Sequence, residues 1–294
     1  MIKKYSIEKE KINTNVSLSI IQDIINKGHY KKIIHNIKNE LSAGNAYQIN
    51  YTMLKKYFIE SNPFDVYLQL RNFSEPLFGY YLNFDDTHIL SFSPEQFFVK
   101  ENNIISSYPM KGTESRSNDF NKDLLLKNKL KESTKNKAEH LMIVDLIRND
   151  LGKICKYGSV KVNKLYNVKS YETVHQMVTE VYGELNDNVC ESDIIKALFP
   201  GGSITGAPKE SAMKIIDKLE NYNRNIYTGA VGYIENNGNM NFNMPIRTMT
   251  IINNEAYYPV GGGIVWDSNY SEEWIEAQLK SKILDNIVQG SFRG

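Results

Sequence analysis

Short turns between strand-like segments in the C-terminal third of the chain constrain its fold more than any other feature. The segments "YTGAVGYIE", "MNFNMPIRTMTII" and "AYYPVGGGIVW" are rich in β-branched and aromatic residues, and only the links "ENNGN" and "NNE" connect them. Links this short join antiparallel neighbours, because a parallel pair needs a crossover of about a dozen residues or more. The chain is therefore predicted to build antiparallel sheets.

Helical patterns alternate with these strands and place the chain in the α+β class. Residues 31–43 carry Ile33, Ile34, Ile37 and Leu41 at helical spacing, and Gly44 follows at a helix-ending position. Beyond that helix the first hundred residues are predicted to be mainly β, with strands in "AYQINYTMLKKYFI", "LFGYYLNF" and "HILSFSPEQFFV". Further helices are expected at 118–151, in "SDIIKALF" and "PKESAMKIIDKLE", and at about 271–288.

The composition excludes several classes of partner. The 35 basic and 34 acidic residues give a formal charge of +1, which removes a general electrostatic argument for binding nucleic acid or an anionic membrane. Cys155 and Cys190 form no CxxC pair, "MIKKYSIEKE" lacks the apolar core of a signal peptide, and no apolar run reaches the roughly 18 residues of a membrane span. These features predict a cytoplasmic protein with free thiols that binds neither nucleic acid nor membrane.

Three glutamates stand in helical patterns where they could hold a cation. Glu273, Glu276 and Lys280 in "SEEWIEAQLKSK" are three and four residues apart and so share one helix face. Such sets are usually solvated surface pairs, and Glu139 in "AEHLMIVDLIRND" is by position an ordinary carboxylate at a helix N-terminus. If these side chains met across a cleft, they would supply the oxygen ligands that a hard divalent cation prefers.

Two glycine-rich segments and one arginine indicate a site for a small anion. "FPGGSITGAPKESAM" lacks the Lys-Ser or Lys-Thr of a P-loop, but backbone N–H groups before a helix can still hold a carboxylate. The glycines of "PVGGGIVW" likewise allow backbone to approach a ligand closely. Arg247 interrupts the apolar pattern of "MPIRTMTI", as a buried guanidinium facing an anion would.

Two further residues keep more than one interpretation. His175 alternates with apolar residues in "YETVHQMVTEV", where a hydrogen-bonded core or edge histidine is the ordinary outcome, and no HExxH or paired-cysteine pattern supports zinc. Lys111 in "SYPMKGTESR" follows a strand-like run, and by itself it is an exposed charge, an anion clamp or a reacting group. The residues alone predict a small-anion site with a carboxylate-bound cation, and they name no reaction.

The order of the motifs resembles one family. "AGNAYQINY", "SFSPEQF", "YPMKGTESR", "AEHLMIVDLIRNDLGKI", "YETVHQMV", "FPGGSITGAPKESAMKIIDKLE", "YTGAVGYI", "IRTMTI" and "GGGIVWDS" are similar to segments of the chorismate-utilising enzymes, which include anthranilate, aminodeoxychorismate, isochorismate and salicylate synthases. The similarity runs from about residue 30 to residue 288. It implies an α+β fold in which two antiparallel sheets form a sandwich around a cleft with helices packed outside, a Mg²⁺ ion, and chorismate held by its carboxylates.

The resemblance also implies roles for individual residues. Glu139, Glu273 and Glu276 correspond to the metal carboxylates, and Glu95 corresponds to the general acid that helps the ring hydroxyl to leave. The expected substrate contacts are Gly112, Thr113 and His175 near the reacting ring, and Ser203, Tyr227, Arg247, Gly261, Gly263 and Lys280 around the carboxylates.

Two positions favour one member of the family. Anthranilate synthases usually carry alanine before the Gly-Thr pair, whereas component I of aminodeoxychorismate synthase carries the lysine of "PIKGT", and this chain reads "PMKGT" at Lys111. Water-adding relatives place a lysine base where Gln48 stands, so ammonia is the expected nucleophile. The resemblance therefore implies amination of chorismate at C4 to 4-amino-4-deoxychorismate, for 4-aminobenzoate and folate synthesis. Lys111 would be the covalent nucleophile, and a glutamine amidotransferase subunit would supply the ammonia.

The chain departs from the family pattern at its beginning and at two side chains. Residues 1–29 are expected to form a leader shorter than the N-terminal region of the family's synthases, and residues 30–294 the catalytic domain. Asn136 stands where relatives often have an acidic residue, and Glu114 replaces a frequent arginine. Two alternatives stay open: an anthranilate synthase large subunit, and a non-catalytic homologue that binds chorismate or an amidotransferase.

Overall fold

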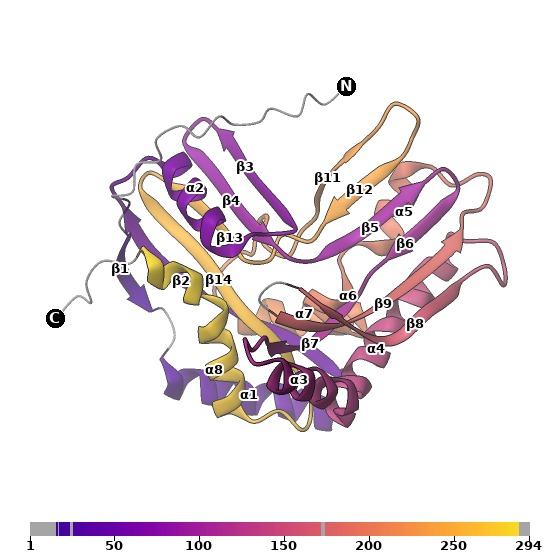
Figure 1. Cartoon of the computed structure of the whole chain (residues 1–294), viewed down its shortest axis with the longest axis horizontal. Helices are drawn as coiled ribbons and strands as arrows, with labels where there is room; N and C mark the ends of the chain where they lie inside the picture. The colour runs from indigo at the N-terminus through magenta and orange to yellow at the C-terminus, as the bar shows by residue number, and fades with distance from the viewer. Residues whose placement is uncertain (1–15, 17, 24–25, 172–173, 288–294) are drawn as a thin grey trace.

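Two seven-stranded sheets organise the chain (Figure 1). The computed structural model describes residues 16, 18–23, 26–171 and 174–287. The first sheet has the order β1-β2-β14-β13-β4-β3, with the short β10 paired to β2. Its strands are β1 (Leu18–Asp23), β2 (Gln48–Ile59), β3 (Phe78–Phe84), β4 (Thr87–Ser93), β10 (Gly206–Ala207), β13 (Thr248–Ile252) and β14 (Glu255–Ile264). Every pairing in it is antiparallel, which confirms the prediction from the short links.

The second sheet has the order β11-β12-β5-β6-β9-β7, with β8 paired to β9. Its strands are β5 (Gln96–Glu101), β6 (Ile104–Ser107), β7 (Met110–Ser115), β8 (Lys161–Ser170), β9 (Val174–Glu184), β11 (Val231–Ile234) and β12 (Met240–Asn243). The single strand expected over "MNFNMPIRTMTII" is wrong, because β12 belongs to this sheet and β13 to the first. Pro245, which has no N–H to donate, and Arg247, with φ of 51°, lie in the break between them.

Two of the places where the chain passes from one sheet to the other are hydrogen-bonded to each other. One crossing joins β4 to β5 around Glu95, and the other joins β12 to β13 from Met244 to Arg247. Met244 N donates to Glu95 O at 3.1 Å, and Phe92 N donates to Arg247 O at 3.1 Å. Main-chain hydrogen bonds therefore fix Glu95 and Arg247 at the junction of the sheets.

Helices α1 (Lys27–Ser42) and α8 (Tyr270–Lys280) cover one face of the first sheet (Figure 1). The Asn26 side chain caps α1 by accepting from His29 N at 2.9 Å, and Ile37 is fully buried in the core between helix and sheet. The helix begins at Lys27 rather than at residue 31. The expected last helix ends at Lys280 and is followed by a 3-10 turn, η1 (Lys282–Asn286), while Val288 lies outside the described residues.

Helix α2 (Pro63–Ser74) corrects the expectation that the first hundred residues are mainly β beyond the first helix. Asn62 Oδ1 accepts from Phe64 N at 2.8 Å, and Pro63 occupies the first helical position, where its missing N–H costs nothing. Val66 and Leu70 are fully buried. Signals for this helix were present in "NPFDVYLQL", and the neighbouring strands obscured them.

The remaining helices lie between and against the sheets, and they are α3 (Phe120–Glu132), α4 (Thr134–Gly152), α5 (Glu191–Leu198), α6 (Gly202–Thr205) and α7 (Lys209–Leu219). The helix expected at 118–151 is thus two helices, divided at Ser133, whose side chain caps α4 by accepting from Asn136 N. Val144 and Leu151 of α4 pack with Val181 of β9 in the second core. This packing brings the N-terminal end of α4 beside α8, where Lys135 Nζ lies 3.9 Å from Glu273 Oε1.

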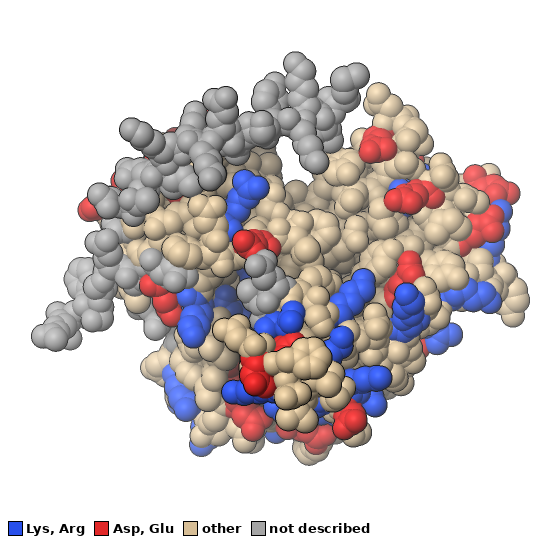
Figure 2. All heavy atoms as spheres, in the orientation of Figure 1, with Lys and Arg blue, Asp and Glu red and all other residues tan. Residues whose placement is uncertain are grey.

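Charged side chains of both signs are interspersed on the face in Figure 2, mainly over the lower half where Figure 1 places α3 and α8. Neither sign forms a continuous patch on that face, as expected from the net charge of +1. In the described part of the chain, no helix is long and apolar enough to cross a membrane. Cys155 is buried, Cys190 is exposed, and both are free thiols.

Candidate active site

Glu95 is buried between β4 and β5 and is linked to the glycine-rich segment. Ser203 Oγ of α6 donates a hydrogen bond to Glu95 Oε1 at 3.0 Å. Burial raises the pKa of the Glu95 carboxyl, while the Ser203 hydrogen bond and the charges of Lys111 and Lys280 oppose the rise. The carboxyl therefore keeps its proton to a higher pH than an exposed glutamate, which suits a general acid.

Lys111 lies in β7 opposite Met177 of β9, immediately before a β-bulge at Gly112. Gly112 has a φ of 68°, and a Cβ there would lie 2.7 Å from Leu130 Cδ1, so a larger residue would be strained. The Lys111 side chain is partly buried, and its ammonium makes no hydrogen bond or ion pair with any described residue. Desolvation lowers the pKa of Lys111, against the opposing charge of Glu139.

Two carboxylates of α8 face the N-terminal end of α4. Glu273 is buried and accepts a hydrogen bond from Ser268 Oγ at 2.7 Å. Glu276 is more exposed and pairs with Lys280 Nζ at 2.8 Å. Burial raises the pKa of Glu273 and of Glu139, whereas at Glu276 the same desolvation is outweighed by Lys280 and the net pKa shift is downward.

The donor set formed by Glu139, Glu273 and Glu276 fits a hard cation in its chemistry. Glu276 raises the pKa of both other carboxyls, which places the three negative charges within reach of one another, and a dication would offset their repulsion. Within the described ranges, however, no three His, Cys, Asp or Glu side chains are close enough to hold an ion as they stand. Lys135 and Lys280 contact the α8 carboxylates instead. The metal role of these glutamates stays a prediction.

Three successive glycines of β14 pass beside the α8 carboxylates. Lys280 Nζ donates to Gly261 O at 2.7 Å, and a Cβ at Gly262 would lie 3.2 Å from the same ammonium. A Cβ at Gly261 would lie 2.1 Å from Tyr51 O, so this position requires glycine. Neighbouring protein atoms thus account for glycine here, and the approach of this backbone to a ligand stays a prediction.

The Gln48 side chain packs against Gly263 with its amide unpaired. It is fully buried, and neither Nε2 nor Oε1 has a hydrogen-bond partner in the described part of the chain. A Cβ at Gly263 would lie 2.9 Å from Gln48 Cδ. Leaving a buried polar group unpaired costs about 1–3 kcal/mol, so the amide needs an explanation, and a ligand that completes its hydrogen bonds supplies one.

Neighbouring positions of β9 make different contacts. Gln176 Nε2 donates to Thr113 Oγ1 at 3.4 Å, which places Gln176 beside an expected substrate contact. His175 instead contacts Asp123 Oδ1 through Nε2 and Ser170 Oγ through Nδ1, both at 3.0 Å. The ordinary interpretation of His175, a hydrogen-bonded buried histidine, describes these contacts. Gln176 was missed, because an amide in an apolar strand carries no signal in the sequence.

Arg247 and Tyr227 lie near the junction of the sheets. The Arg247 guanidinium is partly buried and has neither a hydrogen bond nor an ion pair among the residues that the structure describes. Tyr227 is buried, which raises its pKa, and both side chains act electrostatically on Tyr258. An unpaired, partly buried guanidinium suits an anion site.

The structure brings one set of the predicted residues together. The charges of Glu95, Glu139, Glu276 and Lys280 all act on Lys111, from β4–β5, α4 and α8. Arg224 received no role from the sequence, because it lies in the polar run "NYNRN" that is typical of a loop, yet its side chain is largely buried and donates hydrogen bonds to Glu220 and to Ile204 O of α6.

Comparison with known proteins is consistent with this geometry. A family model described as chorismate binding enzyme matches residues 3–285. Anthranilate synthase component 1 of Saccharolobus solfataricus is 38% identical over 271 residues, which cover 92% of this chain and 64% of that protein. Aminodeoxychorismate synthase component 1 of Escherichia coli is 39% identical over 255 residues, which cover 87% of this chain and 56% of that protein.

A solved structure shows the same fold. The crystal structure of anthranilate synthase component I from Streptococcus pneumoniae superposes with a TM-score of 0.82 at 31% identity, covering 92% of this chain and 60% of that one. This chain thus spans about three fifths of the length of the relatives it matches. The nearly equal identities, 38% and 39%, do not separate the two kinds of synthase. The α+β fold with two antiparallel sheets is confirmed, and a family match over nearly its whole length shows that the chain belongs to the chorismate binding enzymes.

Proposed function

We propose that this chain aminates chorismate at C4 with ammonia and forms 4-amino-4-deoxychorismate. The observation that carries the proposal is Lys111, a partly buried amine with no hydrogen bond or ion pair among the described residues. Desolvation lowers its pKa, so more of it is neutral near neutral pH than of an exposed lysine. The neutral amine is the form that acts as a nucleophile.

Lys111 and Glu95 divide the reaction into two substitutions. Lys111 Nζ bonds to ring C2, the two conjugated ring double bonds shift together, and the C4 hydroxyl leaves as water with the proton that Glu95 donates. Ammonia then bonds to C4, both double bonds shift back, and Lys111 leaves from C2. Each chorismate consumes one ammonia and releases one water, and the proton lost by nitrogen restores Glu95 to its acid form.

The other predicted residues would bind and orient the substrate. Glu139, Glu273 and Glu276 would hold Mg²⁺, which when bound would neutralise these side chains and a substrate carboxylate. We expect the carboxylates of chorismate near Arg247, whose guanidinium lacks a partner in the described structure. The remaining proposed contacts are Gly112, Thr113, His175, Ser203, Tyr227, Gly261, Gly263 and Lys280.

Gln48 supports ammonia rather than water as the nucleophile. Water must lose a proton as it attacks, and a neutral side-chain amide does not accept one near neutral pH. Neutral ammonia is a stronger nucleophile than water, so it can attack without a base and lose its proton afterwards. The unpaired Gln48 amide can accept an N–H of ammonia or donate to the substrate.

A glutamine amidotransferase subunit is the proposed source of ammonia. The matched relatives are named component 1 of their synthases, and that name supports a second component for this chain as well.

Product identity tests the proposed function. The purified protein is incubated with chorismate, Mg²⁺ and an ammonium salt, the product is separated by chromatography, and a lyase that removes pyruvate is then added. We expect 4-aminobenzoate after the second step. Anthranilate would replace the proposal by the second candidate, which the relative from Saccharolobus solfataricus favours, and salicylate would contradict both.

Lys111→Ala separates an enzyme from a binding protein. The proposed function predicts a loss of turnover of at least about 100-fold with chorismate binding partly kept, as titration calorimetry would show. Lys214→Ala is the matched control, because Lys214 is exposed on α7 and pairs only with Glu210 among the described residues. A wild-type protein that binds chorismate without turnover would favour the non-catalytic alternative.

A further inference from the structure

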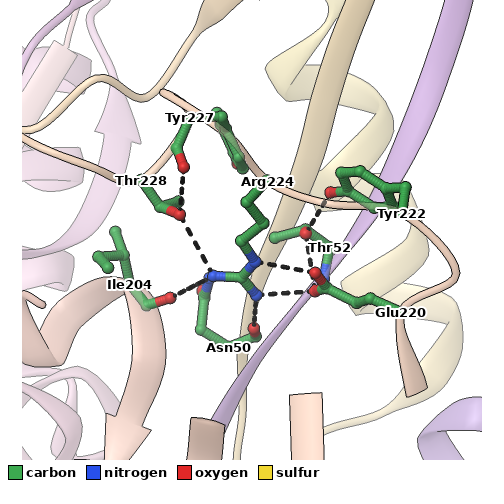
Figure 3. Close-up of polar contacts among 8 residues, drawn as sticks. All are labelled: Asn50, Thr52, Ile204, Glu220, Tyr222, Arg224, Tyr227 and Thr228. Carbon is green, nitrogen blue, oxygen red and sulfur yellow. Dashed lines mark hydrogen bonds and ion pairs between the residues drawn. The ribbon is translucent and has the colours of Figure 1, made fainter. Parts of the chain in front are cut away.

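A buried arginine behind the glycine-rich segment joins several parts of the candidate site (Figure 3). The Arg224 side chain is 14% exposed, and its Nε and Nη2 donate to the two carboxylate oxygens of Glu220 at 2.8 and 2.7 Å. This planar, two-bond pair fixes the orientation of the guanidinium.

Arg224 also donates to main-chain carbonyls of other elements and, at 3.5 Å, to Thr228 Oγ1. Nη1 donates to Ile204 O of α6 at 2.7 Å, and Nη2 donates to Asn50 O of β2 at 2.6 Å (Figure 3). Each carbonyl adjoins part of the candidate site, because Ile204 follows Ser203 and Asn50 pairs with Gly263. One side chain thus holds α6 against the strand that carries Gln48.

The Ile204 carbonyl needs these donors because α6 is a single helical turn. In a longer helix the N–H of residue 208 would bond to this carbonyl, but residue 208 is Pro208, which has none. Arg224 Nη1 and Asn50 Nδ2, at 2.7 and 3.0 Å, take its place. The position of α6, and of Ser203 within it, therefore depends on side chains outside the turn.

The Glu220 half of the pair is equally fixed. Its side chain is 2% exposed and accepts from Thr52 N and Thr52 Oγ1, both at 2.7 Å. Tyr222 OH lies 2.5 Å from the same threonine hydroxyl (Figure 3). A fully hydrogen-bonded buried pair of this kind specifies one arrangement of the segments that it joins.

We infer that Arg224 is a positioning residue that holds Ser203 in place to donate its hydrogen bond to Glu95. The inference rests on the proposed function, in which Glu95 is the general acid. It goes beyond that function by assigning control of the acid to a side chain that belongs to none of the family motifs quoted above.

The protonation of Glu95 gives a readout that a merely structural role would not move. The charged groups that face Glu95 are Lys111 of β7 and Lys280 of α8, and Asp150 of α4 lines the same cavity of about 20 Å³. Variants of Arg224 leave these three unchanged. Loss of the Ser203 hydrogen bond removes a stabilising contact from the ionised carboxylate, so Glu95 should lose its proton at a higher pH.

The test measures kcat against pH for the wild type, Ser203→Ala, Arg224→Lys and the double variant. In Ser203→Ala the alkaline limb, where Glu95 loses its proton, should move up by about one pH unit, the size of one hydrogen bond to a charged group. Arg224→Lys should move the limb the same way and lower kcat by about tenfold, because lysine cannot reproduce the fork. The double variant should move the limb no further than Ser203→Ala alone.

Two controls separate positioning from lost stability. Val66→Ala removes buried methyl groups from α2, away from the α6 turn, and should lower Tm without moving the limb. If Arg224→Lys does not fold, Glu220→Gln can replace it, because it weakens the Arg224–Glu220 pair while keeping its shape. This variant should also move the alkaline limb of the kcat profile to higher pH.

A second readout does not depend on turnover. The infrared band of the protonated Glu95 carboxyl, identified by its loss in Glu95→Gln, should persist to higher pH in the Arg224 and Glu220 variants. If the band persists to higher pH in the variants of a protein that makes no product, the positioning role would be supported and the proposed function contradicted. An unchanged band and limb in both variants, or additive shifts in the double variant, would overturn the inference.

Discussion

Replacing Gln48 by methionine should stabilise the folded protein and lower its catalytic activity. Methionine has nearly the shape of glutamine and no polar atoms at its end, so it can fill the space between β2 and Gly263 without the unpaired amide. The side chain is fully buried, and the substitution removes a desolvation penalty of about 1–3 kcal/mol. For a chain of this size the gain corresponds to a rise in Tm of roughly 2–6 °C.

Calorimetry and steady-state kinetics measure the two effects in the same samples. We expect Gln48→Met to melt at a higher temperature and to lose at least about tenfold in kcat/KM for ammonia, because the amide that would contact the reactants is gone. Gln69→Met is the matched control, since the Gln69 Oε1 of α2 is also unpaired in the described structure but lies away from the site. That variant should gain stability and keep its activity.

A Gln48→Met variant that melts at a lower temperature than the wild type and keeps its activity would refute this role of Gln48. A lower Tm would mean that the folded protein already satisfies the amide, for instance with buried water. Unchanged kinetics would mean that the amide does not meet the reactants. The two results together would leave Gln48 as a core residue with no part in choosing ammonia.

Three further predictions concern charge. Burial and the nearby Lys111 hold the pKa of His140 at about 4, so between about pH 4 and 6.5 the unfolded chain binds a proton that the folded chain excludes. The free energy of unfolding should therefore rise with pH in this range by about 3 kcal/mol. Denaturant titrations at several pH values should show a weaker dependence of the unfolding free energy on pH in His140→Asn. Burial raises the pKa of Glu95, so the stability of the folded protein falls as pH rises through that pKa. Glu95→Gln should be more stable than the wild type at pH 8, and this advantage should be smaller at pH 5. The variant should also be at least about 100-fold slower, and equal activity would exclude Glu95 as the acid. Chelation of Mg²⁺ should abolish turnover, and added Mg²⁺ should raise the Tm of the wild type but not of Glu273→Gln; identical Tm shifts in both would remove Glu273 from the metal site.

Local sequence patterns predicted the parts of the fold that local chemistry determines. The link "NNE" predicts the β13–β14 hairpin, because its two asparagines adopt left-handed backbone and the flanking strands must then be antiparallel. The break between β12 and β13 was not predicted, although Pro245 lies in it, because strand-forming residues flank it closely on both sides. Its cause is the crossing to another sheet, where Met244 and Arg247 bond to residues about 150 positions earlier in the chain.

The candidate site depended even more on distant residues. Helical spacing put Glu273 and Glu276 on one face, but nothing in that spacing brings Lys135 of α4 to within 3.9 Å of Glu273. Only the order of the family motifs linked these residues before the structure was known. The unpaired Gln48 amide and the contacts of Arg224 result from tertiary packing, and no local residue pattern predicts them.

Burial shifts Lys111 and Glu95 toward the protonation states that the proposed reaction needs. An exposed lysine and glutamate at neutral pH carry opposite charges, and neither could act as nucleophile or acid in that form. Desolvation lowers the pKa of Lys111 and raises that of Glu95, and so favours the neutral form of both. Their mutual attraction opposes this, because each favours the charged form of the other. The direction of both net pKa shifts shows that desolvation prevails. The charge of Lys280 lowers both pKa values, so it favours neutral Lys111 but ionised Glu95. The Ser203 hydrogen bond also opposes the rise in the pKa of Glu95. In the role inferred above, the Arg224 network holds Ser203 in place, so it would limit this rise and let Glu95 release its proton to the leaving hydroxyl.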